Sequence, residues 1–162
     1  MKKLIFLIYF LTASVFSFGQ GDVEFCYELT PDVDNDSLLH VQARIVNSTN
    51  QKFYFLSESC NDLEYYLQTG SEDVEVFVRM HCNISYPVKK FIEAKSQYTF
   101  KSMLKVKNNS NNFELNLNLV QLDATTNVEE KIISALHNEY DFQTWQLKGQ
   151  LLKPPYTTEH NK

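Results

Sequence analysis

The chain has 162 residues and a formal net charge of −5, with 20 acidic and 15 basic side chains. This acidic balance repels phosphate backbones, and no basic patch with interleaved aromatic residues offsets it, so nucleic acid is excluded as a partner. The chain contains only four glycines, which argues against a glycine-rich phosphate loop.

The first nineteen residues have the pattern of an export signal. Lys2 and Lys3 precede the apolar run Leu4–Phe18. Ser17 and Gly19 place small side chains where a signal peptidase reads. The apolar run is fifteen residues long, shorter than the roughly 20 that a membrane-spanning helix needs. We therefore expect cleavage after Gly19 and a secreted or periplasmic protein without a transmembrane segment; the alternative is a signal retained as an anchor.

From Val23 to Leu122, apolar and polar residues alternate with a period of two, which indicates β-strands with one buried and one wet face. Polar turns such as Asp32–Ser37 and Asn47–Asn50 separate these strands. The expected buried rows are, in chain order, Val23, Phe25, Tyr27 and Leu29; Leu39, Val41, Ala43 and Ile45; Phe53 and Phe55; Leu63, Tyr65 and Leu67; Val74, Val76, Val78 and Met80; Tyr98, Phe100, Leu104 and Val106; and Phe113, Leu115, Leu117 and Leu119.

Two places in this region carry further signals. Thr69-Gly70-Ser71 lies between two strand-like runs, which predicts a hairpin turn. Val120 and Leu122 shift the alternation by one residue after the row that ends at Leu119, which predicts a β-bulge.

One segment near the C-terminus predicts a helix. Asn127 and Glu130 stand at capping-box spacing, and apolar residues recur every four positions over 128–136. A strand is the alternative there, because the segment contains two β-branched isoleucines. A final strand is expected over Trp145–Leu151, and the tail over 156–162 is expected to fray.

The pattern predicts an all-β fold, namely an Ig-like antiparallel β-sandwich with one short helix near the C-terminus. Seven or more short strands at spacings of about ten residues favour two packed antiparallel sheets. A closed barrel is the alternative. The antibody-type order Cys, Trp, Cys is absent, because the only Trp follows all three cysteines. We expect a signal peptide over 1–19, one domain over 20–155 and a flexible tail over 156–162.

The strand region also carries a family resemblance. Leu38–Asn47 is followed by the polar turn Ser48-Thr49-Asn50, by Phe53–Leu56 and later by Phe91–Phe100 with its Tyr-x-Phe pattern. Residues 23–122 thereby resemble small exported bacterial Ig-like β-sandwich proteins, similar to intracellular-proteinase-inhibitor-like domains. The resemblance implies the fold and a possible inhibitor function. It transfers no functional residue, because the turn before the last of these strands lacks the family's Pro and Gly.

The three cysteines are disulfide candidates in an oxidising compartment. Cys60 and Cys82 flank two strand-like runs, and a disulfide between them would leave Cys26 over. Lipid attachment at Cys26 is disfavoured, because Glu24 and Phe25 precede it where a lipobox has small and aliphatic residues. The alternative is that all three cysteines are reduced and packed as small apolar side chains.

Asp32, Asp34 and Asp36 alternate as the oxygen ligands of a calcium ion do. Ser37 and Ala43 stand where an EF-hand loop has Gly and Glu, so a solvated turn is the favoured interpretation.

The histidines and cysteines lack the spacing of a zinc or copper site. His81 and Cys82 are adjacent, so a strand would send their side chains to opposite faces and separate a nucleophilic pair. We expect no metal, no cofactor and no catalytic residue.

Tyr54, Tyr66 and Phe77 fall on the wet side of the alternation. If their strands are neighbours, they form an exposed apolar patch of the kind that marks a partner or sugar site. The alternative is that both sheet faces are covered there or that the strands are not adjacent.

The resulting hypothesis is an exported, non-enzymatic binding or adhesion-type module with a protein or carbohydrate partner at the cell envelope. A proteinase inhibitor that presents a loop such as Asn83–Lys90 is one alternative. A small envelope hydrolase is the other.

Overall fold

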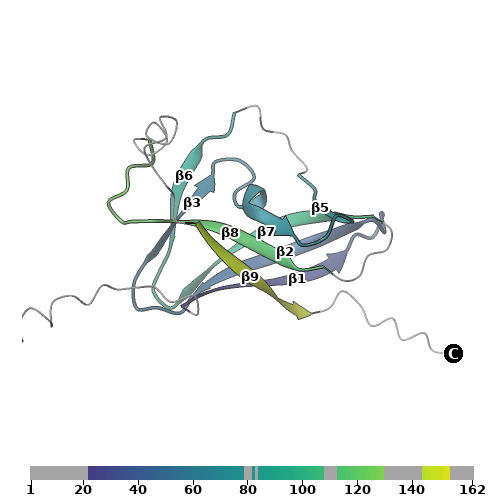
Figure 1. Cartoon of the computed structure of the whole chain (residues 1–162), viewed down its shortest axis with the longest axis horizontal. Coiled ribbons are helices and arrows are strands. Elements are labelled where there is room, and N and C mark those ends of the chain that lie inside the picture. Colours follow the sequence, from purple (N-terminus) through teal and green to yellow (C-terminus); the bar gives the residue numbers. More distant parts are fainter. Residues whose placement is uncertain (1–21, 79–81, 83, 108–112, 130–143, 154–162) are drawn as a thin grey trace, which may run out of the picture.

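The computed structural model describes residues 22–78, 82, 84–107, 113–129 and 144–153. In this part the chain folds as an all-β, Ig-like sandwich (Figure 1). The elements are β1 (Val23–Pro31), β2 (Leu38–Asn47), β3 (Phe53–Glu58), the 3₁₀ turn η1 (Glu64–Tyr66), β4 (Leu67–Thr69), β5 (Val74–Val76), β6 (Pro87–Ile92), β7 (Ser96–Val106), β8 (Leu115–Leu122) and β9 (Thr144–Lys153).

One layer has the strand order β5-β7-β2-β1-β9. Its centre is antiparallel, with β2 paired along its whole length to β1 on one side and to β7 on the other. β9 adds to β1 in parallel, from Phe25↔Gly149 to Glu28↔Lys153. The expected final strand is therefore confirmed, and it lies beside the first strand of the domain.

The other layer contains β8, β3 and β6, with β4 also paired to β8. β9 is shared between the layers, because its first half pairs with β8 and its second half with β1. Figure 1 shows β9, in yellow, running between β8 and β1. The sheet is thus continuous around this side of the sandwich.

The core lies between the layers and is made by the predicted alternating rows. Phe25 of β1 stacks on Phe100 of β7, with ring centroids 6.3 Å apart. Phe55 of β3 meets Tyr98 of β7 edge-on at 5.3 Å, which joins the two layers. Leu115, Leu117 and Leu119 are fully buried, as the alternation predicted.

The predicted hairpin at Thr69-Gly70-Ser71 is wrong. β4 pairs with β8, whereas β5 pairs with β7, so this turn carries the chain from one layer to the other. The Gly70 N–H bonds to the Glu114 carbonyl, 2.9 Å away, which ties the turn to the start of β8. β5 ends at Val76, so the strand predicted to continue to Met80 is shorter than expected.

The row Leu63, Tyr65 and Leu67 is replaced by a 3₁₀ turn. A 3₁₀ turn has three residues per turn, so side chains three apart share a face. Leu63 is therefore buried and Tyr66 packs against the core, while Tyr65 is 53% exposed. The alternation with a period of two predicts the reverse, with Tyr65 buried and Tyr66 on the wet face.

The predicted bulge at Val120 is also wrong. β8 pairs with β9 from Asn116↔Lys148 to Val120↔Thr144 without a shift of register. Val120 and Leu122 continue the other face of β8 and are buried there. The alternation changes at Val120 because both faces of β8 are covered there, so apolar side chains occupy both faces without an inserted residue.

Three sequence predictions concern residues outside the described ranges. The N-terminal signal and the C-terminal tail lie there entirely, and so does most of the predicted helix. At its start, Glu129 donates its backbone N–H to Asn127 Oδ1, 3.1 Å away, but the helix itself is not confirmed. Among the helices of the described residues, none has the length and apolar character to cross a bilayer.

Candidate binding platform at the disulfide

Cys60 and Cys82 form a disulfide, as predicted, with Cα atoms 6.4 Å apart. Cys26 is the free cysteine among the described residues and is buried on β1. The bond joins the segment after β3 to the segment before β6. We call residues 58–66 and 84–87, with this disulfide, the disulfide platform.

Hydrogen bonds hold the two segments of the platform together. Ser59 donates its N–H to the Tyr86 carbonyl at 2.9 Å, and the Tyr86 N–H returns a bond to Ser59 Oγ at 3.1 Å. These bonds continue the pairing of β3 and β6 beyond Glu58↔Pro87. The platform is therefore an extension of a sheet, closed by a covalent bond.

Glu58 adds a side-chain link between the segments. Its carboxylate accepts hydrogen bonds from Ser85 Oγ at 2.8 Å and from the Tyr66 hydroxyl at 3.3 Å. Burial, and then the Glu58 charge, raise the pKa of Tyr66 well above its ordinary value. The Tyr66 phenol therefore stays protonated and remains a donor.

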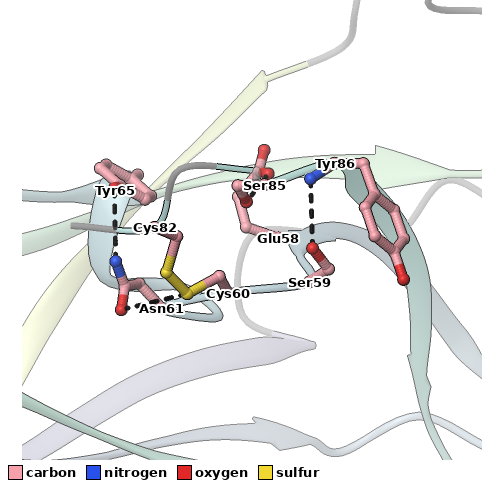
Figure 2. The surroundings of a disulfide bond; sticks show 8 residues. All are labelled: Glu58, Ser59, Cys60, Asn61, Tyr65, Cys82, Ser85 and Tyr86. Atoms are coloured by element: carbon pink, nitrogen blue, oxygen red, sulfur yellow. Dashed lines mark hydrogen bonds between the residues drawn. A yellow bond between two sulfur atoms is a disulfide. The ribbon is translucent and has the colours of Figure 1, made fainter. Parts of the chain in front are cut away.

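Three large apolar side chains project from the platform into solvent. Ile84 is 82% exposed, Tyr86 60% and Tyr65 53%. Figure 2 shows the disulfide between Tyr65 and Tyr86, with the Tyr65 hydroxyl accepting a bond from Asn61 Nδ2 at 3.3 Å. Exposed aromatic and aliphatic side chains on a constrained segment are typical of surfaces that bind a partner.

Asp62 lies beneath this surface and binds three donors. Its Oδ1 accepts from Ser57 Oγ at 2.5 Å and from Lys90 Nζ at 2.8 Å, and its Oδ2 accepts from the Tyr98 hydroxyl at 2.5 Å. Lys90 Nζ also donates to the Tyr98 hydroxyl, 2.7 Å away. The carboxylate thus connects β3 and β6 of one layer with β7 of the other.

The charges of this cluster shift the pKa of its members. Burial, and then the bond to Asp62, raise the pKa of Tyr98. Burial alone would lower the pKa of Lys90, but its bonds to Asp62 and Tyr98 raise it above the ordinary value. At neutral pH Lys90 is therefore a cation and Tyr98 a neutral phenol, and both donate to the Asp62 side chain.

The structure does not join Tyr54, Tyr66 and Phe77 into one patch. The Tyr54 ring, on the outer side of β3, packs against Phe91 at 5.9 Å. Tyr66 packs against the core. Phe77 is 37% exposed and follows β5 in the layer opposite Tyr54, where its N–H bonds to the Met103 carbonyl of the neighbouring strand β7.

The sequence indicates part of the platform as an exposed loop. The predicted loop Asn83–Lys90 contains Ile84 and Tyr86, but its second half is strand, because β6 begins at Pro87. Asn83 itself lies outside the described residues. Tyr65 was assigned to a buried row, and the spacing of residues along the chain gave no signal for the role of Asp62.

The acidic turn between β1 and β2 is internally bonded. Asp32 accepts the Asp34 N–H at 3.0 Å and His40 Nε2 at 2.8 Å, and these contacts lower the pKa of Asp32. In the described ranges, no three His, Cys, Asp or Glu side chains are grouped as a metal site requires.

No family model matches the chain, and no curated protein matches its sequence. Among solved structures, WR4, a C. elegans MSP family member, is 10% identical with a TM-score of 0.37, over 80% of this chain and 95% of that one. SSP-19, an MSP-domain protein like family member in Caenorhabditis elegans, is 11% identical with a TM-score of 0.30, over 70% and 88%. Similarity this low carries no information on function.

Proposed function

We propose that this protein is an exported, non-enzymatic binding module that recognises a protein partner through the disulfide platform. The observation that carries the proposal is the exposure of Tyr65, Ile84 and Tyr86 on two segments held by a disulfide and by backbone bonds. Preorganised loops lose little conformational entropy on binding. A protein partner fits better than a carbohydrate, because the aliphatic Ile84 has no polar atom for a sugar hydroxyl.

Site-specific photo-crosslinking tests the platform. A photoreactive residue at Ile84 or at Tyr86 should capture a discrete partner from the producing culture, and Tyr65→Ser with Tyr86→Ser should abolish capture from Ile84. Val33 is the matched control position, because it is 97% exposed but lies in the turn between β1 and β2. Equal capture from Val33 and Ile84 would refute the platform as the binding surface.

Export is supported by the basic start, the apolar run and the small residues at 17 and 19. N-terminal sequencing of the protein recovered from the medium or periplasm should begin at Gln20. An intact Met1 in membrane fractions would instead support a retained anchor.

Proteinase inhibition is the second candidate. It is favoured by the residues just before β6, because Cys82 is anchored there by the disulfide, Tyr86 bonds to Ser59, and Ile84 and Tyr86 are exposed. An inhibitor should block a secreted proteinase at a molar ratio near one and remain uncleaved. Inertness across serine, cysteine and metalloproteinases would remove this candidate. No observation on the described residues favours the hydrolase.

A further inference from the structure

We infer that Asp62 is the positioning residue of the disulfide platform, holding Tyr65 and Tyr86 in their presented arrangement. This inference rests on the proposed function for its biological meaning, but the arrangement can be measured without a partner. Three observations lead to it: the positive φ angles at 61–62, the hydrogen bonds to the Asp62 carboxylate, and the absence of a shared strand on this side of the sandwich among the described residues.

The backbone at this point is in an unfavourable region. Asn61 and Asp62 have φ angles of 61° and 47°, the left-handed region that glycine favours. Non-glycine residues there cost free energy and persist only where the surroundings hold them. The Glu58 N–H bonds to the Asp62 carbonyl at 3.1 Å, so this turn also sets the direction of the chain into η1.

The bonds to the Asp62 side chain hold this backbone in place. Ser57, Lys90 and Tyr98 each donate to the carboxylate, and Lys90 contributes a charge. The disulfide constrains the neighbouring residue, Cys60. A side chain with three donors from three strands fixes both the position and the orientation of the turn.

The side of the sandwich where Asp62 lies lacks a shared strand. On the opposite side, β9 pairs with both layers. On this side the layers are joined by the short chain connection over 93–95, by the bonds of Asn47 to the Ile92 and Glu93 carbonyls, by the Asp62–Lys90–Tyr98 cluster and by the packing of Phe55 on Tyr98. Among these links, the Asp62 cluster is the one that includes a platform residue, so Asp62 attaches the platform to both layers.

Amide hydrogen exchange of purified mature protein tests the inference. In Asp62→Asn, the N–H groups of Glu58, Ser59 and Tyr86 should exchange roughly tenfold faster or more, because bonds to a charged acceptor are lost. The amides of Asp32 and Val106, which bond to Leu38 and Ser37, should keep their rates. Asp32→Asn is the matched control, since it removes a carboxylate bonded within another turn.

Two results would overturn the inference. One is unchanged exchange at the platform in Asp62→Asn, and the other is an equal rise at every amide, which would indicate global destabilisation. If Asp62→Asn fails to fold, Tyr98→Phe removes one donor and should give a smaller rise confined to the same amides. Crosslinking from Ile84 is a separate measurement. Faster amide exchange confined to the platform, together with no partner captured from Ile84, would support the positioning role and refute the proposed function.

Discussion

Asn47 shows how one buried polar residue connects two turns. Its Nδ2 lies 2.7 Å, 3.2 Å and 3.0 Å from the carbonyl oxygens of Gln51, Ile92 and Glu93. Its Oδ1 accepts the N–H and the hydroxyl of Thr49. The side chain is fully buried, so these bonds replace its contacts with water.

Asn47→Asp should lower the free energy of unfolding by about 3 kcal/mol or more, because the carboxylate oxygen that replaces Nδ2 would be buried against three carbonyl oxygens and could donate to none of them. Chemical denaturation at neutral pH measures this loss. Asn118→Asp is the control and should change stability little, because Asn118 is only half-buried on β8. A change below 1 kcal/mol in Asn47→Asp would show that the site admits water.

Gly149 is the residue that lets β9 approach its neighbours. A Cβ at this position would lie 2.5 Å from Tyr27 Cε1 and would also collide with the Leu115 carbonyl oxygen. Gly70 differs, because a Cβ there would meet the Glu114 Cβ and carbonyl oxygen at an ordinary 3.8 Å.

Gly149→Ala should destabilise the protein by about 3 kcal/mol, because the clash involves backbone that cannot move without opening β8 and β9. Gly70→Ala should stay within about 0.5 kcal/mol of the wild type. Thermal unfolding of both variants makes the comparison, and equal melting temperatures would contradict the predicted close approach of β9.

At the scale of elements, the segments around the disulfide are short and irregular. η1 and β4 have three residues each, and β5 has three. Such elements bury little surface of their own, so they depend on the longer strands and on the disulfide.

The Cys60→Ala/Cys82→Ala variant should lose about 3 kcal/mol of stability, as expected for a disulfide that closes a loop of this length. Urea unfolding with and without a reductant tests it. The reductant should bring the wild type to the stability of the variant and should leave the variant unchanged. A reductant effect on the variant would point to Cys26 or to intermolecular disulfides.

At the scale of the whole molecule, the two sides of the sandwich close by different means. Shared pairing of β9 closes one side, whereas on the other side the chain connection over 93–95, the Asn47 bonds and the Asp62 cluster join the layers. The second side depends on protonation, because Lys90 must be charged and Tyr98 must be neutral for their bonds to form as described.

Stability should therefore fall in alkaline solution. Burial, first of all, raises the pKa of Tyr27, Tyr66 and Tyr98. Burial lowers the pKa of Lys90, but its bonds to Asp62 and Tyr98 raise it overall. A raised pKa means that the folded state holds its proton more tightly, so the stabilisation is complete below the unfolded tyrosine pKa of about 10 and is lost above it. Urea unfolding from pH 8 to pH 11 measures this. Constant stability across that range would contradict the predicted coupling.

Much of the fold could be predicted from the sequence. The buried rows at Val23–Leu29, Val41–Ile45 and Leu115–Leu119 lie where the alternation placed them, because successive side chains of a strand point to opposite faces. The disulfide was also predicted, because Cys60 and Cys82 flank two strand-like runs, although the sequence left three reduced cysteines open as the alternative. Of the candidate site, the sequence indicated Ile84 and Tyr86 only as members of the loop Asn83–Lys90 in the inhibitor alternative, and the second half of that range is strand β6.

The sequence by itself therefore determined the long strands, their inward rows and the class of fold, because these depend on a local period of two. Only the tertiary structure decided which strands pair, that Tyr65 is exposed while Tyr66 is covered, and that Val120 and Leu122 are buried on the second face of β8. It also brought Ser57, Lys90 and Tyr98 to Asp62. The physical reason is that a local pattern shows only how side chains alternate between the two faces of one strand. Burial and hydrogen bonding depend on which distant segments pack against that strand.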